Sequence, residues 1–298
     1  MRDYVFEDYK KILEDHITAF IPDIDHKSIT LYESMKYSIA NGGKRIRPVL
    51  LLAACDFCGG NVEEALPYAC AIEYIHTYSL IHDDLPCMDD DDLRRGQPTN
   101  HKVYGEAVAT LAGDGLQAAA YEVMNRDMLL YFDNPDALKK RVRACHEIAK
   151  GSGCNGIVAG QIADMEAEGT NCSEEMVNYI HLAKTASLIV AAVKAGAQLG
   201  GADAKTLSNL SAYAENLGLA FQIADDLLDV TGESDEMGKN TGMDAAHSKA
   251  TYPSLFGIDE SIRRLNEHTE LAIDALSEYY DNAELFVKLA KALASRTK

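Results

Sequence analysis

The sequence has 298 residues, and its proportions of hydrophobic (47%) and charged (25%) residues are those of an ordinary globular protein. Its net charge of −19 makes nucleic acid and anionic membrane surfaces poor partners. No run approaches ~18 consecutive apolar residues, and the acidic amino terminus lacks the apolar segment of a secretory signal. We therefore expect a cytoplasmic protein without a membrane span, whose seven cysteines are reduced thiols.

Helical spacing of apolar residues dominates the chain. No proline lies between Pro135 and Pro253, and that stretch repeats apolar residues at helical intervals, for instance at Ile180 and Leu188. No alternating run is long enough for a convincing strand. Because no linker divides the chain, the sequence predicts a single all-α domain over residues 1–298, with ten or more helices. Helix breaks are expected near Pro22 and at residues 42–43, 59–60, 96–98, 134–135, 169–171, 200–201 and 232–250.

The first motif in chain order is a glycine turn, GGKRIRP, at residues 42–48. The turn leads into a predicted helix with Pro48 near its start. Backbone amides at a helix start attract anions, and Lys44, Arg45 and Arg47 would add positive charge. The turn is therefore a candidate phosphate site, although a short basic turn alone carries little weight.

The second motif is HDDLPCMDDDDLRRG, at residues 82–96, which follows a long apolar run. Pro86 should interrupt the helix and let Asp83 and Asp89 converge. Arg94 and Arg95 follow at once and could make bidentate contacts to an anion. A solvated acidic turn is the alternative interpretation of this segment alone.

The third motif is FQIADDLLD, at residues 221–229. Asp225 and Asp229 are four residues apart, so on a helix they share one face and repel each other unless a cation lies between them. Carboxylate and water ligands suit Mg²⁺. A surface helix face is possible for this segment alone, but two such clusters favour a metal site, and bridging ions would let this acidic protein bind an anionic substrate.

Together the motifs resemble those of the trans-prenyltransferase family of isoprenyl diphosphate synthases. The resemblance runs in order from Gly42 to Pro253, and the spacing in DDLPCMD is similar to that of bacterial and plant-type farnesyl and geranylgeranyl synthases. Lys184, Lys239 and Lys249 would otherwise pass for ordinary surface lysines. The motifs that carry the resemblance are GGKRIRP, DDLPCMD with LRRG, GQIADMEAEG, KT, FQIADDLLD and K-x-T-Y-P.

The resemblance implies a bundle of helices around a deep central cavity, usually as a homodimer, and three Mg²⁺ ions bound with diphosphate. Asp83 and Asp89 would coordinate two ions with support from Asp84. Asp225 would hold the third, with Asp229 and Asp226 acting through water.

The same resemblance assigns the substrate sites. Arg94, Lys184 and Lys239 would bind the allylic diphosphate, and Thr185 and Gln222 would line the path of the allylic cation. Isopentenyl diphosphate would be bound by Lys44, Arg47, His76 and Arg95, with Lys249 in the K-x-T-Y-P segment. Without the resemblance, His76 would be interpreted as a core histidine. Gln161 and Asp164 would support neighbouring groups. Catalytic roles fall to Asp84, Lys184, Thr185, Gln222 and Asp229.

Product length is expected to depend on the floor of the chain-binding tunnel, at Tyr78 and Ser79. Helical spacing puts Ser79 more nearly beneath Asp83 than Tyr78, so geometry alone does not single out the tyrosine. By resemblance, an aromatic residue here stops growth at fifteen carbons, which favours farnesyl over geranylgeranyl diphosphate.

Two other functions remain as alternatives. A class I terpene cyclase would share the fold, but its second metal motif needs Ser or Thr where this chain has Asp229. A non-catalytic helical subunit would typically lose one aspartate motif, whereas both motifs are intact here.

Overall fold

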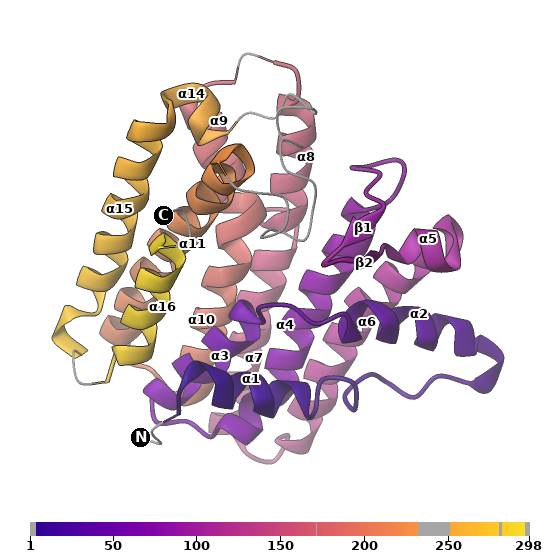
Figure 1. Ribbon diagram of the computed structural model, residues 1–298. Helices are drawn as coiled ribbons and strands as arrows, with labels where there is room; N and C mark the ends of the chain where they lie inside the picture. Colours follow the sequence, from indigo (N-terminus) through magenta and orange to yellow (C-terminus); the bar gives the residue numbers. More distant parts are fainter. Residues whose placement is uncertain (1–3, 171, 232–250, 280–281, 296–298) are drawn as a thin grey trace.

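The computed structural model describes residues 4–170, 172–231, 251–279 and 282–295. Helices make up nearly all of the regular structure in these ranges (Figure 1), and the strands among them are one two-residue antiparallel pair, β1 (Leu93–Arg94) with β2 (Gln97–Pro98). The all-α prediction with ten or more helices is confirmed.

The amino-terminal half supplies the turn and the first aspartate motif. Its helices are α1 (Phe6–Glu14), α2 (Ile29–Ala40), α3 (Ile46–Phe57), α4 (Val62–Asp83), α5 (Asn100–Tyr104), α6 (Glu106–Leu130) and α7 (Pro135–Ser152), with a short 3₁₀ turn, η1 (His26–Ser28).

The remaining part contains the second aspartate motif, on the longest helix described. Its elements are α8 (Ile157–Ala167), α9 (Glu174–Ile180), the π-helical η2 (His181–Ala186), α10 (Ser187–Gly200), α11 (Ala204–Thr231), α14 (Tyr252–Phe256), α15 (Ile258–Ala275), the 3₁₀ turn η3 (Ser277–Tyr279) and α16 (Glu284–Ser295).

Most predicted helix breaks coincide with observed ends. Gly59 and Gly201 have φ of +80° and +84°, a conformation that ends helices readily only at glycine, and the side chain of Asn134 caps α7. The sequence did not reveal the break at residues 153–156 between α7 and α8, where Gly156 lies so close to the carbonyl of Gly151 that no side chain fits.

Helix α4 runs through the middle of the main apolar cluster and is buried along most of its length, against α3 and α6. A helix that is apolar on all sides suits such a place. Helix α10 packs closely on α3 because Gly196 lets it approach the carbonyl of Leu51. The carboxyl ends of α4 and α11 both lie in the upper part of Figure 1, which places the two aspartate motifs toward one end of the bundle.

One continuous stretch, Glu174–Gly200, is long and apolar enough to cross a membrane by length and composition, a feature that the count of consecutive apolar residues missed. Of its most apolar window, 61% is buried inside the protein. Such burial is typical of a core helix, so the stretch is explained by its packing in the bundle.

Each of the seven cysteines is a free thiol, as expected. Cys55 and Cys58 flank the carboxyl end of α3, and burial raises the pKa of both thiols to about 12. The two thiols are therefore protonated at neutral pH and behave as packing groups.

Candidate active site

The loop after α4 brings the first aspartates together. Helix α4 ends at Asp83, and the chain turns at Pro86 so that the backbone N–H of Asp89 donates to the carbonyl of Asp83 at 2.9 Å. Both side chains are half-buried. The interruption predicted from Pro86 therefore occurs, and it juxtaposes two aspartates that a continuous helix would have separated.

Asp84 has a different environment from Asp83. Its carboxylate is buried and accepts a hydrogen bond from Nε of Arg94 at 2.5 Å. Arg94 also lies 3.1 Å from Asp91. Burial disfavours the charge of Arg94, but the hydrogen bond to Asp84 and the charges of Asp84 and Asp91 outweigh it, so the pKa of Arg94 is raised. Asp84 thus anchors the arginine beside the first motif.

Arg95 lies over the glycine turn. Its guanidinium donates to the carbonyl of Gly42, and a side chain on Gly43 would bring a Cβ within 2.6 Å of the guanidinium carbon. Gly43 also has φ of +137°. The second glycine of the turn is therefore required both by its backbone conformation and by the arginine that passes against it.

Arg47 and His76 form the centre of the basic group. Nη1 of Arg47 lies 3.4 Å from Nε2 of His76, while Nε of Arg47 and Nδ1 of His76 are buried without a hydrogen-bond partner. Burial, followed by the charges of Arg47 and Arg95, holds the pKa of His76 well below its usual value. Burial also lowers the pKa of Arg47. Buried polar atoms without partners beside clustered cations indicate a site for an anion.

Arg45 does not belong to this group, contrary to the prediction from the turn. Its side chain is buried and donates to Glu14 at 2.7 Å, to Glu73 at 2.6 Å and to the carbonyl of Ile39 at 2.6 Å. Lys44, by contrast, is exposed. Of the three basic residues in this motif, Arg45 therefore supports the fold.

The second aspartate motif lies within electrostatic reach of the basic group. The negative charges of Glu73 and then of Asp225, on α11, act on Arg47, on α3, and oppose the lowering of its pKa. Asp225 is half-buried and Asp229, one turn later, is buried. Among the residues that the structure describes, no three acidic, histidine or cysteine side chains converge on one point as metal ligands. Pairs of carboxylates, such as Asp83 with Asp89 and Asp225 with Asp229, suit Mg²⁺, because this ion takes one or two carboxylates and completes its shell with water and phosphate oxygens.

Lys184 and Thr185 lie on η2, the π-helical segment. Nζ of Lys184 donates to Asp164, on α8, at 2.5 Å, and the hydroxyl of Thr185 donates to Oε1 of Gln222, on α11, at 2.6 Å. Gly160 touches the backbone of Lys184, because a Cβ there would lie 2.1 Å from the Lys184 nitrogen. Asp164, from the GQIAD motif, therefore holds the ammonium group of Lys184 in place.

Tyr78 and Ser79 lie on α4 below the first motif. The Tyr78 ring is buried, packs edge-on against His82 at 5.8 Å between centroids, and has a hydroxyl without a hydrogen-bond partner. Burial, then Tyr121 and Asp83, raises its pKa to about 12. The Ser79 hydroxyl donates to the carbonyl of His76 at 2.9 Å. Of the two residues, Tyr78 therefore has the larger side chain and the hydroxyl without a hydrogen-bond partner.

Two predicted residues, Lys239 and Lys249, lie outside the described residues. A group that the sequence only hinted at surrounds Asp226: its carboxylate accepts from Nε2 of Gln222 at 2.8 Å and from the backbone N–H of Tyr252 at 3.0 Å. Both aspartate motifs contain an Asp-Asp doublet, Asp83-Asp84 and Asp225-Asp226. In both doublets the first aspartate is half-buried and the second is buried against protein donors.

Comparison with known proteins agrees with this geometry. The chain matches the sequence profile of the Polyprenyl synthetase family over residues 28–283. It is 44% identical to a geranylgeranyl diphosphate synthase from Cyanophora paradoxa, over 98% of this chain and 95% of that protein. Identity to a farnesyl diphosphate synthase from Bacillus subtilis is 40%, over 97% of this chain and 96% of that protein.

A solved structure has the same fold. A geranyltransferase from Helicobacter pylori, complexed with magnesium and isoprenyl diphosphate, superimposes with a TM-score of 0.83 at 30% identity, over 97% of this chain and 95% of that chain. The chain therefore belongs to the polyprenyl synthetase family of trans-isoprenyl diphosphate synthases, and it is a prenyltransferase.

Proposed function

We propose that this prenyltransferase uses Mg²⁺ to condense isopentenyl diphosphate with dimethylallyl or geranyl diphosphate, and that its product is farnesyl diphosphate. The observation that carries the proposal is the environment of Arg47. This arginine has a buried Nε without a partner, lies beside His76, and faces the charge of Asp225. Cations on α3 and α4 and a carboxylate on α11 thus lie within electrostatic reach of one another, which suits diphosphates bound with divalent ions.

Asp83 and Asp89 are the proposed ligands of two Mg²⁺ ions, and Asp225 of a third, with Asp229 beside it. Asp83, Asp89 and Asp225 are half-buried, and an Mg²⁺ ion bound by one or two carboxylates completes its shell with water and phosphate oxygens. The magnesium complex of the Helicobacter pylori relative supports the choice of metal. When bound, the ions would supply positive charge against the leaving diphosphate.

The allylic diphosphate is assigned to Arg94, Lys184 and Lys239. Arg94 and Lys184 already have carboxylate partners, Asp84 and Asp164, which hold the two side chains in place. Such anchoring means that less side-chain freedom is lost when the substrate binds.

Isopentenyl diphosphate is assigned to Lys44, Arg47, His76 and Arg95, with Lys249 from the K-x-T-Y-P segment. A neutral His76 can donate one hydrogen bond to a phosphate oxygen. Thr185 and Gln222 would line the path of the allylic cation, and the departing diphosphate would accept the proton lost from isopentenyl diphosphate.

Farnesyl diphosphate is favoured over geranylgeranyl diphosphate because Tyr78 is large, buried and five residues before Asp83. The curated relatives include both kinds of synthase, at 40% and 44% identity, so similarity does not discriminate between the products. Side-chain volume at this position is the physical argument for fifteen carbons.

We also infer a single catalytic domain, because the main apolar cluster draws residues from Tyr9 to Leu293. A cytoplasmic homodimer is the assembly expected from the resemblance. Exposed Leu129, Leu130 and Phe132, at the end of α6, add apolar surface that a second copy could cover. Light scattering on the purified protein tests the dimer.

The decisive experiment supplies isopentenyl diphosphate and dimethylallyl diphosphate with Mg²⁺ and determines the carbon number of the product. Farnesyl diphosphate is expected, and chelation of the metal should abolish its formation. Absence of elongation would contradict the proposal. Release of a hydrocarbon from farnesyl diphosphate alone would instead favour a terpene cyclase.

A further inference from the structure

Both oxygens of the Asp226 carboxylate accept hydrogen bonds from protein donors. Oδ1 accepts from Nε2 of Gln222 at 2.8 Å, and Oδ2 accepts from the backbone N–H of Tyr252 at 3.0 Å. Nε2 of His181 lies 3.3 Å from the same Oδ2. The side chain is 2% exposed. These contacts give Asp226 a task other than holding an ion.

A carboxylate can only accept hydrogen bonds, so Asp226 fixes the orientation of the Gln222 amide. The amide nitrogen must face Asp226, and the amide oxygen must then face Thr185. The hydroxyl of Thr185 donates to that oxygen at 2.6 Å. The hydroxyl proton of Thr185 therefore points toward Gln222, and the lone pairs of the Thr185 oxygen point away from Gln222, toward a neighbouring group in the site.

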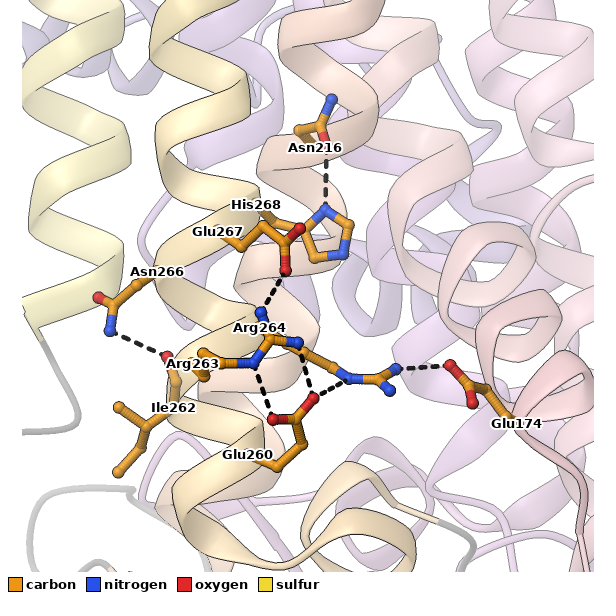
Figure 2. A network of polar contacts seen from close by, with 9 residues as sticks. All are labelled: Glu174, Asn216, Glu260, Ile262, Arg263, Arg264, Asn266, Glu267 and His268. Carbon is orange, nitrogen blue, oxygen red and sulfur yellow. Dashed lines mark hydrogen bonds and ion pairs between the residues drawn. The ribbon is translucent and has the colours of Figure 1, made fainter.

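The elements that carry Asp226 and its partners are held in place by packing. The His181 and Tyr252 rings stack at 5.0 Å with 18° between their planes. Figure 2 shows Arg264, on α15, between Glu260 and Glu174, which it contacts at 2.9 and 2.6 Å. The same guanidinium lies 3.9 Å from the centre of the Phe256 ring, on α14. Helices α9, α14 and α15 are joined through this one side chain.

We propose that Asp226 is a positioning residue that sets the direction of the hydrogen bonds through Gln222, so that Thr185 presents oxygen lone pairs to the allylic cation. An O–H bond pointing the other way would present its positive end and oppose the charge that develops in the reaction. This inference rests on the proposed function, because it needs a cation beside Thr185.

Asp226→Asn is the first test, because an asparagine amide can donate to Gln222. If Gln222 turns to accept that bond, its own nitrogen faces Thr185 and the hydroxyl must point into the site. We expect kcat to fall about tenfold or more, with KM for both substrates changed less than about threefold. If Asp226 had a purely structural role, its substitution would lower the melting temperature without lowering kcat much more than it changes KM.

The double variant Gln222→Glu with Asp226→Asn restores the direction. The new asparagine donates to the new glutamate, which still accepts from Thr185, and the net charge of the pair is unchanged. We expect the double variant to be faster than either single variant. The comparison with Gln222→Glu alone remains informative even if Asp226→Asn does not fold.

Asp127→Asn, on α6, is the matched control, because Asp127 is also a buried carboxylate, accepts from Arg141, on α7, at 2.9 Å, and is not among the site residues described above. It should lose stability and keep its kcat. A folded double variant that is no faster than Gln222→Glu would overturn the directional role. If the unmodified enzyme fails to elongate any substrate, the proposed function fails instead.

Discussion

Nη1 of Arg45 donates to the carboxylate of Glu73 over 2.6 Å, and both side chains are shielded from solvent. Removing the arginine would leave a buried carboxylate without its partner. We expect Arg45→Ala to lower the free energy of unfolding by about 3–5 kcal/mol in urea denaturation. Arg47→Ala, two residues along, should instead raise KM for isopentenyl diphosphate. Equal stability of Arg45→Ala and the unmodified protein would contradict the structural role of Arg45.

Gly43→Ala should displace Arg95, since its Cβ would overlap the guanidinium. We expect weaker binding of isopentenyl diphosphate, measured as a severalfold rise in KM. Gly42→Ala is the matched control, because Gly42 also has positive φ but has no atom within 4 Å of a Cβ. That variant should cost about 1 kcal/mol of stability and keep its KM. The same KM for the two variants would disprove the contact.

Tyr78→Ala should lengthen the product beyond fifteen carbons, because it removes the largest side chain of the proposed tunnel floor. Mass spectrometry of the dephosphorylated products measures the length. Tyr78→Phe keeps the ring and removes a buried hydroxyl that has no hydrogen-bond partner, so stability should hold and the product should stay the same. If Tyr78→Ala leaves the product unchanged, the floor lies elsewhere.

Asp164→Asn should loosen Lys184, which it holds at 2.5 Å. We expect a rise in KM for the allylic diphosphate of about three- to tenfold, because the lysine must be ordered during binding. Lys194 and Glu147 form a similarly half-buried pair at 2.7 Å, and Glu147→Gln should leave that KM unaltered. A like response of the two variants would point to a general loss of stability.

The stability of the protein should depend on His76 below neutral pH. Burial, then the nearby arginines, keeps the folded-state pKa well below 6.5, so above that value the residue is neutral in both states and contributes nothing. Below it, the unfolded chain binds a proton that the folded chain does not. Stability therefore falls as the pH drops, by up to about 1.4 kcal/mol per pH unit from this residue.

Urea denaturation of the unmodified protein and of His76→Asn between pH 7.5 and 5 measures this contribution. The difference in stability between the two proteins should change with pH below 6.5. A constant difference would mean that the pKa of His76 is the same in the folded and unfolded states.

The sequence was informative where function and local geometry agree. Pro86 predicted that Asp83 and Asp89 converge, and the backbone N–H of Asp89 does donate to the carbonyl of Asp83. It misled at Arg45, because a basic residue in a glycine turn has the same sequence pattern whether it faces a ligand or a buried Glu73 from a distant helix. The link from Asp226 to Thr185 could not be predicted either, because it depends on Tyr252, brought back from a later segment.

The π-helical turn at His181–Ala186 has a consequence for how the chain can vary. A π turn contains one more residue than an α turn would, so Lys184 and Thr185 are set by the length of this segment as well as by their identity. Deleting one alanine here would rewind it into an α-helix and rotate the preceding residues by about 100° relative to α10. The site would keep the same residues, but the side chains of Lys184 and Thr185 would no longer have the same orientation. Counting residues in this segment is therefore as informative as reading them when distant members of the family are aligned.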